Sequence, residues 1–226
     1  MRALLRCLAL FLLPVLAACG RTADGTAGTP AASAAASAGA VATGHYPDLF
    51  AEAGIPAAEV EARIEEAFGR LFHGDPDEEA VYYEAGANGH GPLAYILDVH
   101  NGDVRSEGMS YGMMIAVQLD RRREFDALWN WALTHMYQDD PAHPAYGYFA
   151  WSLRPDGTPN DAMPAPDGEE YFATALYFAA ARWGEGEGPY AYRAWADRIL
   201  THALHRGPIT GATVTARQAT AINLFD

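Results

Sequence analysis

Acidic side chains gather at two places in this sequence, and aromatic side chains surround both. The first is Glu107, where the charged, glycine-containing start of DVRSEGMSYGMMIAVQLD (residues 103–120) runs into an apolar stretch. The second is the loop WSLRPDGTPNDAMPAPDGEEYF (residues 151–172), with the acids Asp156, Asp161, Asp167, Glu169 and Glu170. Sugar rings stack on aromatic faces, and carboxylates act on hydroxyls and on the glycosidic oxygen. The combination therefore indicates a carbohydrate cleft, lined by some of Trp129, Trp131, Tyr137, Tyr146, Tyr148, Phe149 and Trp151.

Each acidic position also has a purely structural interpretation. Asp167 stands three residues before Glu170, which is capping-box spacing, so it can be the N-cap of a helix. Ser106 can cap the helix that follows it, which leaves Glu107 as a first-turn acid that complements the helix dipole. The aromatic residues can equally belong to the core, because they recur at helical spacing.

Glu107 can act as a general acid only if it is protonated near neutral pH. A position at a helix start, beside Arg105, favours the ionised form instead. Desolvation against Met109 or Tyr111, or a second carboxylate close by, would oppose that tendency. Asp167 is the obvious second carboxylate, so we expect it to lie near Glu107.

The residue types do not indicate a metal site. The loop acids lack the alternating D-x-[DN]-x-[DN]-G order of a calcium loop, and the eight histidines form no H-E-x-x-H pattern. We therefore expect neither a metal nor another cofactor.

The overall charge limits the classes of partner. The chain has 226 residues, 15 basic against 29 acidic, and a net charge of -14. Such a charge argues against nucleic acid and anionic membrane surfaces as partners. It is compatible with a neutral substrate such as an oligosaccharide.

The N-terminal residues predict export rather than a folded element. Arg2 and Arg6 precede an apolar core that is shorter than the roughly 20 residues of a membrane-spanning helix. LAAC, ending at Cys19, resembles a bacterial lipobox, which predicts a signal peptide over 1–18 and a lipid on Cys19; an ordinary signal peptide that contains a cysteine is the alternative. Residues 19–44 are rich in Ala, Gly, Ser and Thr and predict a flexible tether. We expect an exported protein that reaches a membrane only through its lipid anchor.

From residue 45 onward the pattern is helical and strand signals are scarce. Apolar spacing with Pro and Gly at the ends predicts five helices, at about 56–74, 108–119, 122–137, 168–184 and 190–207. Residues 74–92 read as a polar loop, 93–99 as a short apolar run of either type, and 138–167 as a long loop. The expected class is all-α, with helices paired in antiparallel hairpins and decorated loops at one end.

Two long blocks of the sequence resemble glycoside hydrolase family 8. They are DVRSEGMSYGMMIAVQLDRRREFDALWNW and YGYFAWSLRPDGTPNDAMPAPDGEEYFATALYFAAARWG, and the likeness extends over about residues 46–206. Within the family they are most similar to the reducing-end xylose-releasing exo-oligoxylanases. The resemblance implies an (α/α)6 barrel of six helical hairpins and inverting hydrolysis of a β-1,4-linked sugar chain, here xylo-oligosaccharides.

The resemblance also implies roles for individual residues. The proton donor of the family falls on Glu107, and the acid that binds and distorts the sugar before the cleaved bond falls on Asp167. Tyr111 and Trp151 lie in matching segments and are expected to be substrate-binding aromatic residues.

The chain differs from the family pattern in its C-terminal part. An inverting enzyme needs a second carboxylate that activates water, and the resemblance puts this residue beyond Asp226. Twelve helices with short loops need at least roughly 200 residues, whereas residues 45–226 number 182. We therefore expect residues 45–226 to be a partial catalytic domain, the N-terminal half to two-thirds of a barrel, that is inactive by itself.

Other functions remain open from the sequence. An endo-acting glucanase, chitosanase or xylanase of the same family would use the same two acids. A carbohydrate-binding lipoprotein without catalysis would use the same aromatic loop. An epimerase or lyase on a helical barrel is less compatible, because such enzymes usually need His or Tyr bases or a metal.

Overall fold

The computed structural model describes residues 43–143 and 145–205. It divides into two compact units at Asp48 and Leu49, and all the elements below belong to the second unit. The predicted signal peptide, Cys19 and nearly all of the predicted tether lie outside the described residues.

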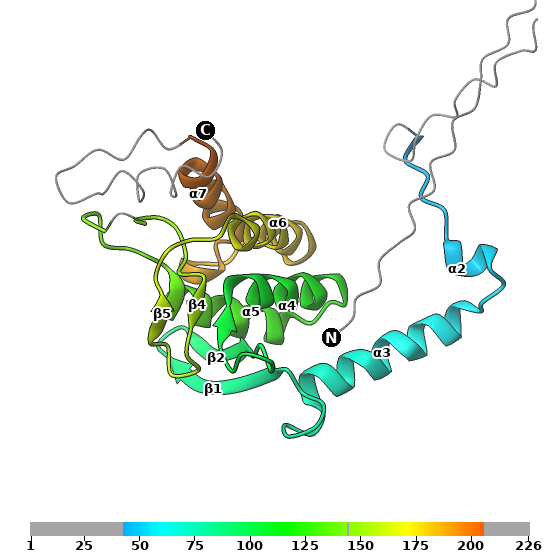
Figure 1. The fold of residues 1–226 in the computed structure, drawn as a ribbon. Coiled ribbons are helices and arrows are strands. Elements are labelled where there is room, and N and C mark those ends of the chain that lie inside the picture. The colour runs from blue at the N-terminus through cyan, green and yellow to red at the C-terminus, as the bar shows by residue number, and fades with distance from the viewer. Residues whose placement is uncertain (1–42, 144, 206–226) are drawn as a thin grey trace, which may run out of the picture. The chain divides into compact units, whose positions relative to one another are not determined.

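Helices make up most of the second unit, and the five predicted helices are confirmed (Figure 1). The predicted third helix ends as a π-helical turn, and two short elements were not foreseen. The helical elements are α2 (Leu49–Glu52), α3 (Ala57–His73), α4 (Ser106–Gln118), α5 (Arg122–Trp131), π-helix η1 (Ala132–Met136), α6 (Pro166–Trp183), 3-10 helix η2 (Gly188–Tyr190) and α7 (Tyr192–His205).

Proline and glycine set the ends of the longer helices. Pro56 precedes α3 and Gly74 follows it, and the Gly74 N–H donates to the carbonyl of Arg70. Pro166 is the first residue of α6, where its missing N–H leaves no intrahelical bond unmade. Gly184 ends α6 with a φ of 77°, a conformation that costs glycine little.

Helices α4 and α6 run side by side in the same direction (Figure 1). At their N-terminal ends a Cβ on Gly168 would lie 2.6 Å from the Cβ of Ser106. At their C-terminal ends the Trp183 indole N–H donates to Asp120, at 2.6 Å. Helix α5 packs on α4, and α7 packs on α6, so the chain forms two helical hairpins whose first helices lie together.

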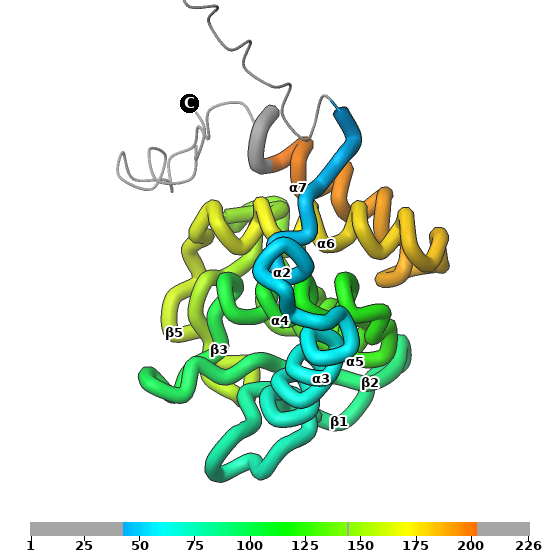
Figure 2. Tube along the Cα trace, turned by 90° about the vertical axis from the view of Figure 1, so that its right-hand side faces the viewer, coloured from blue at the N-terminus to red at the C-terminus, as the bar shows by residue number. Residues whose placement is uncertain are grey.

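Two small sheets that were not predicted accompany the helices. Strands β1 (Tyr82–Asn88) and β2 (Gly91–Ile96) form an antiparallel hairpin within residues predicted to be mostly loop, and β2 packs against α5 (Figure 2). Strands β3 (Val104–Arg105), β4 (Ser152–Leu153) and β5 (Pro159–Asp161) form a second antiparallel sheet. The prediction of a loop failed because β1 reads YYEAGAN, in which no large apolar residue alternates with polar ones after the two tyrosines.

An aromatic core joins the two hairpins. Trp129 of α5 lies 5.7 Å from Phe149 and 5.8 Å from Phe172 between ring centroids, and its indole N–H donates to the carbonyl of Pro189. Four of the aromatic residues that were candidates for the cleft are fully buried, and their interpretation as core is correct: Trp129, Trp131, Tyr148 and Phe149.

Over the described part of the chain, no helix combines the length and the apolar character that crossing a bilayer requires.

Candidate active site

Glu107 lies in the first turn of α4, where its side chain is exposed. One turn further on, the hydroxyl of Tyr111 donates to Oε1 of Glu107, at 3.1 Å. This hydrogen bond is the main reason why the pKa of Tyr111 lies above its ordinary value; burial and the charges of Glu107 and Asp167 act in the same direction. The carboxylate is therefore held by a neighbour on its own helix, with its other oxygen open to a ligand.

Asp167 lies in the first turn of α6, and this turn packs against the first turn of α4, which carries Glu107. Gly168 approaches Ser106 so closely that a Cβ on Gly168 would lie 2.5 Å from the Ser106 hydroxyl oxygen. The electrostatic effect of Asp167 on Tyr111 agrees with this placement. The two helix turns that carry Glu107 and Asp167 are thus neighbours, and the role of Asp167 as the second carboxylate stays a prediction.

The two capping interpretations are wrong. The N-cap of α6 is Ala165, and Asp167 lies within the first turn, where its Oδ1 accepts the N–H of Gly168 at 3.0 Å. The N-cap of α4 is Arg105, without a side-chain capping bond. Ser106 is already the first residue of α4, and its side chain is buried against Gly168.

A short segment, residues 149–152, bridges α6 and the start of α4 through hydrogen bonds, and we name it the strap. The N–H of Ser106 donates to the carbonyl of Trp151, at 3.0 Å, and the N–H of Trp151 donates to the carbonyl of Met163, at 2.9 Å. The N–H of Ala150 donates to the carbonyl of Met136, at 2.8 Å. Trp151, predicted to bind substrate, thus also fixes the backbone at the N-terminus of α4.

Arg105 was expected to favour ionised Glu107, but its charge is paired elsewhere. Its Nε lies 3.2 Å from Asp98 and 3.0 Å from Asp103, and its guanidinium lies over the Trp151 ring at 5.4 Å. Asp103 also accepts a hydrogen bond from the Ser152 hydroxyl, at 2.7 Å. The cation therefore holds the Trp151 ring in place, and two carboxylates other than Glu107 balance its charge.

A pocket of about 230 Å³ opens beside Glu107. It combines an apolar wall, two carboxylates, a cation and a phenol: Ile96, Leu97, Asp98, Arg105, Glu107, Gly108 and Tyr111. An apolar wall next to hydrogen-bonding groups suits a sugar ring, which has C–H faces and a rim of hydroxyls.

Tyr171 lies next to Tyr111 and was not among the residues predicted from the sequence. Its ring meets that of Tyr111 edge to face, with 5.0 Å between centroids, and both side chains are exposed. Tyr171 follows Asp167 by four residues, as Tyr111 follows Glu107. The spacing of an acid and a tyrosine one helical turn apart, present in both helices, was the signal that could have identified it.

Glu169 is a further carboxyl group near the site, and its side chain is buried, unlike that of Glu107. It is 1% exposed, and its Oε1 accepts the N–H of Phe149 at 2.9 Å. Burial raises the pKa of Glu169 to about 8, and the charges of Asp167 and Glu170 act in the same direction. Glu169 is therefore closed off from a ligand in the pocket, and its burial favours the protonated form of its carboxyl group.

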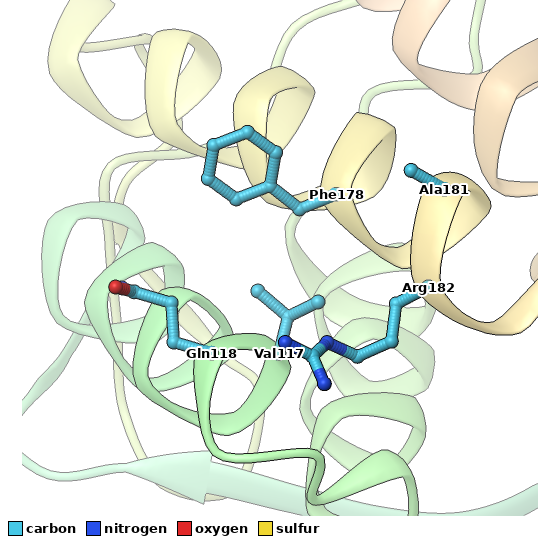
Figure 3. A pocket seen from close by; sticks show the side chains of 5 residues that line it. All are labelled: Val117, Gln118, Phe178, Ala181 and Arg182. Carbon is cyan, nitrogen blue, oxygen red and sulfur yellow. The ribbon is translucent and has the colours of Figure 1, made fainter. Parts of the chain in front are cut away.

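A separate hollow, lined by both α4 and α6, lies at the C-terminal ends of these helices. Figure 3 shows Val117 and Gln118 of α4 facing Phe178, Ala181 and Arg182 of α6 across a groove of about 530 Å³. No acid lines this groove, so it lacks the groups that glycosidic bond cleavage needs.

A family model and several known enzymes match this chain. The model of the glycosyl hydrolases family 8 matches residues 98–214. A reducing end xylose-releasing exo-oligoxylanase of Halalkalibacterium halodurans is 50% identical over 170 residues, which are 75% of this chain and 42% of that protein. An endoglucanase of Cellulomonas uda is 35% identical over 124 residues, 54% of this chain and 32% of that protein.

A solved structure shares the fold. A GH8 xylobiose complex from Teredinibacter turnerae has 64% sequence identity and a TM-score of 0.74, and the match covers 79% of this chain and 45% of that one. The chain thus spans less than half the length of the relatives that it matches.

Proposed function

This chain belongs to glycoside hydrolase family 8, and on that premise we propose that it takes part in inverting hydrolysis of β-1,4-linked xylo-oligosaccharides, with release of xylose from the reducing end. The convergence of Glu107, Asp167, Tyr111 and Trp151 at the joined N-termini of α4 and α6 carries the proposal. The name of the Halalkalibacterium relative supports the choice of xylo-oligosaccharide and of exo action.

In this proposal Glu107 donates a proton to the departing sugar oxygen. The exposed carboxyl group faces a pocket, and the hydroxyl of Tyr111 orients it through Oε1. Protonation of the leaving group by a positioned acid contributes about 10²- to 10⁴-fold to the rate.

Asp167 binds the sugar on the other side of the cleaved bond and favours its distorted ring. The close approach of Gly168 to Ser106 supports this role, because it brings the helix turn that carries Asp167 against the helix turn that carries Glu107. The rings of Tyr111 and Trp151 supply apolar faces for the sugar, and Arg105 fixes the second of them.

We also propose that α4–α5 and α6–α7 are two of the six hairpins of an (α/α)6 barrel. Such a barrel has parallel inner helices, and α4 and α6 are parallel, with their acids at one end. The substrate cleft would then lie across that end of the barrel.

The experiment separates sugar binding from proton donation. Binding of xylotriose to the full chain is measured by calorimetry, and xylose release is measured with and without azide, a nucleophile that needs no general base. Glu107→Gln is compared with Glu59→Gln, which changes an exposed acid in the first turn of α3.

We expect Glu107→Gln to lower xylose release in azide by about 10²- to 10⁴-fold while the Kd changes less than threefold. Glu59→Gln should match the wild type in both. Release that survives Glu107→Gln would contradict the donor role.

The alternatives predict different outcomes. Binding without xylose release, in azide or in buffer, would indicate a non-catalytic carbohydrate-binding protein. Faster cleavage of longer β-glucan, chitosan or xylan chains, at internal bonds, would indicate an endo-acting enzyme, which the likeness to the Cellulomonas endoglucanase favours over other changes of function.

We further propose that the protein is exported and that a lipid on Cys19 anchors it to a bacterial membrane. The LAAC sequence after an apolar stretch supports this proposal. Labelling with a fatty-acid analogue should mark the wild type and Cys7→Ser, but not Cys19→Ser. Label that remains in Cys19→Ser would contradict the anchor.

A further inference from the structure

A buried acid lies two residues after Asp167, in the first turn of α6. Glu169 is 1% exposed, and one of its oxygens accepts the Phe149 N–H at 2.9 Å. Its other oxygen, Oε2, is also buried and has no hydrogen-bond partner within residues 43–143 and 145–205. Burying a polar atom without a partner costs free energy, so this carboxyl group needs a role that offsets the cost.

Hydrogen bonds connect Glu169 to the candidate proton donor through the strap. Glu169 holds the N–H of Phe149, the first strap residue. The third strap residue, Trp151, accepts the N–H of Ser106, which precedes Glu107 directly in the chain. The position of Glu107 therefore depends on a path from α6 to α4 that begins at the Glu169 side chain.

The surroundings of Glu169 favour an uncharged acid. Burial raises its pKa to about 8 and the charges of Asp167 and Glu170 act in the same direction, which together outweigh the opposite effect of the Phe149 N–H on the pKa. Because Oε1 accepts the Phe149 N–H, the proton of the neutral acid belongs on Oε2. A glutamine reproduces this arrangement, with its carbonyl oxygen in the place of Oε1.

We propose that Glu169 is a positioning residue of the site: by holding the Phe149 N–H it fixes the strap, and so it orients the N-terminus of α4 that carries Glu107. It acts through the strap and not on the sugar, because its side chain is closed off from the pocket. The effect on the sugar rests on the proposed function, whereas the effect on the strap does not.

The test compares two neutral replacements of similar length. Glu169→Gln keeps an acceptor for the Phe149 N–H, and Glu169→Met fills the same space without one. Hydrogen exchange of the full chain reports on residues 149–152 and 104–107, and the β1–β2 hairpin serves as an internal reference. Xylotriose affinity is measured on the same samples, with Leu176→Ala, a fully buried change on α6, as a control for general destabilisation.

We expect Glu169→Met to speed exchange in both segments at least tenfold and to weaken xylotriose binding, while Glu169→Gln resembles the wild type. Leu176→Ala should lower the Tm but leave affinity within twofold at temperatures where it is folded. Unchanged exchange in Glu169→Met would overturn the proposal. A loss of protection in Glu169→Gln equal to that in Glu169→Met would also overturn it. If the wild type fails to bind xylotriose, the proposed function fails, and the exchange data still decide the positioning role.

Discussion

The two ends of the α4–α6 helix pair differ in chemistry although the same helices build both. At the N-terminal end lie Glu107 and Asp167, two tyrosines and a strap of backbone hydrogen bonds. At the C-terminal end a groove is lined by Val117, Phe178 and Ala181, with Phe178 48% exposed. One indole hydrogen bond from Trp183 to Asp120 ties that end together.

The comparison teaches that helix direction and loop placement, not apolar packing alone, decide where chemistry can occur. Free N–H groups and the positive end of the dipole favour acids at helix N-termini. In this fold both N-termini also receive the long 138–165 segment, which supplies Trp151 and the strap. The C-terminal end is followed by the short connections to α5 and to η2.

The largest expected effect concerns pH and the N-terminal end. Unfolded Glu169 loses its proton near its ordinary pKa of 4.5, whereas the folded chain holds the proton until about pH 8. Stability therefore falls as pH rises between these values, by at most about 1.4 kcal/mol per pH unit, and levels off above pH 8. Urea unfolding of the wild type and of Glu169→Gln from pH 5 to 9 should show this slope only in the wild type. Parallel curves would contradict a raised pKa.

The next largest effect is expected from a substitution that pushes the N-terminal ends of α4 and α6 apart. In Gly168→Ala the added Cβ would lie 2.6 Å from the Cβ of Ser106, so α6 has to move away from α4. We expect a loss of about 1–3 kcal/mol in unfolding free energy and at least tenfold weaker xylotriose binding.

The matched control is Gly69→Ala in α3, where no atom lies within 4 Å of the new Cβ. There the better helix propensity should raise stability by about 0.5–1 kcal/mol, and sugar binding should not change. Equal effects of the two substitutions in thermal unfolding would show that the α4–α6 contact is not tight.

A smaller effect is expected from Tyr111→Phe. The change removes the hydrogen bond to Glu107 but keeps the ring contact with Tyr171. Xylose release in azide should fall about two- to tenfold, which corresponds to one modest hydrogen bond, with an unchanged Tm. Tyr171→Phe, whose hydroxyl belongs to the other helix, should have less effect. The reverse order would show that the wrong tyrosine has been assigned to the acid.

The smallest effect on the site is expected at the opposite end. Phe178→Gln alters the groove without touching either acid. Xylotriose affinity should stay within twofold, and unfolding free energy should change by no more than about 1 kcal/mol because the ring is half exposed. Calorimetric binding that weakens tenfold would show that the two ends are coupled.

Much of the helical framework was predictable from residues alone. Apolar spacing, with Pro56 and Gly74 at the ends of α3 and Gly184 at the end of α6, placed both helices to within a few residues. The β1–β2 hairpin was not predictable, because its strands carry glycine and polar residues on an exposed face and draw their stability from packing on α5.

Residue types alone identified the side chains that can do chemistry: an acid before a helix at Glu107, a second at Asp167, and aromatic residues near both. Their arrangement in space follows from the packing of distant segments. The approach of Gly168 to Ser106 joins the two acids, and burial separates Trp129 and Phe149 of the core from Trp151 beside Arg105. The reason is physical: residue type sets what a group can do, but distance and burial depend on contacts between segments about sixty residues apart.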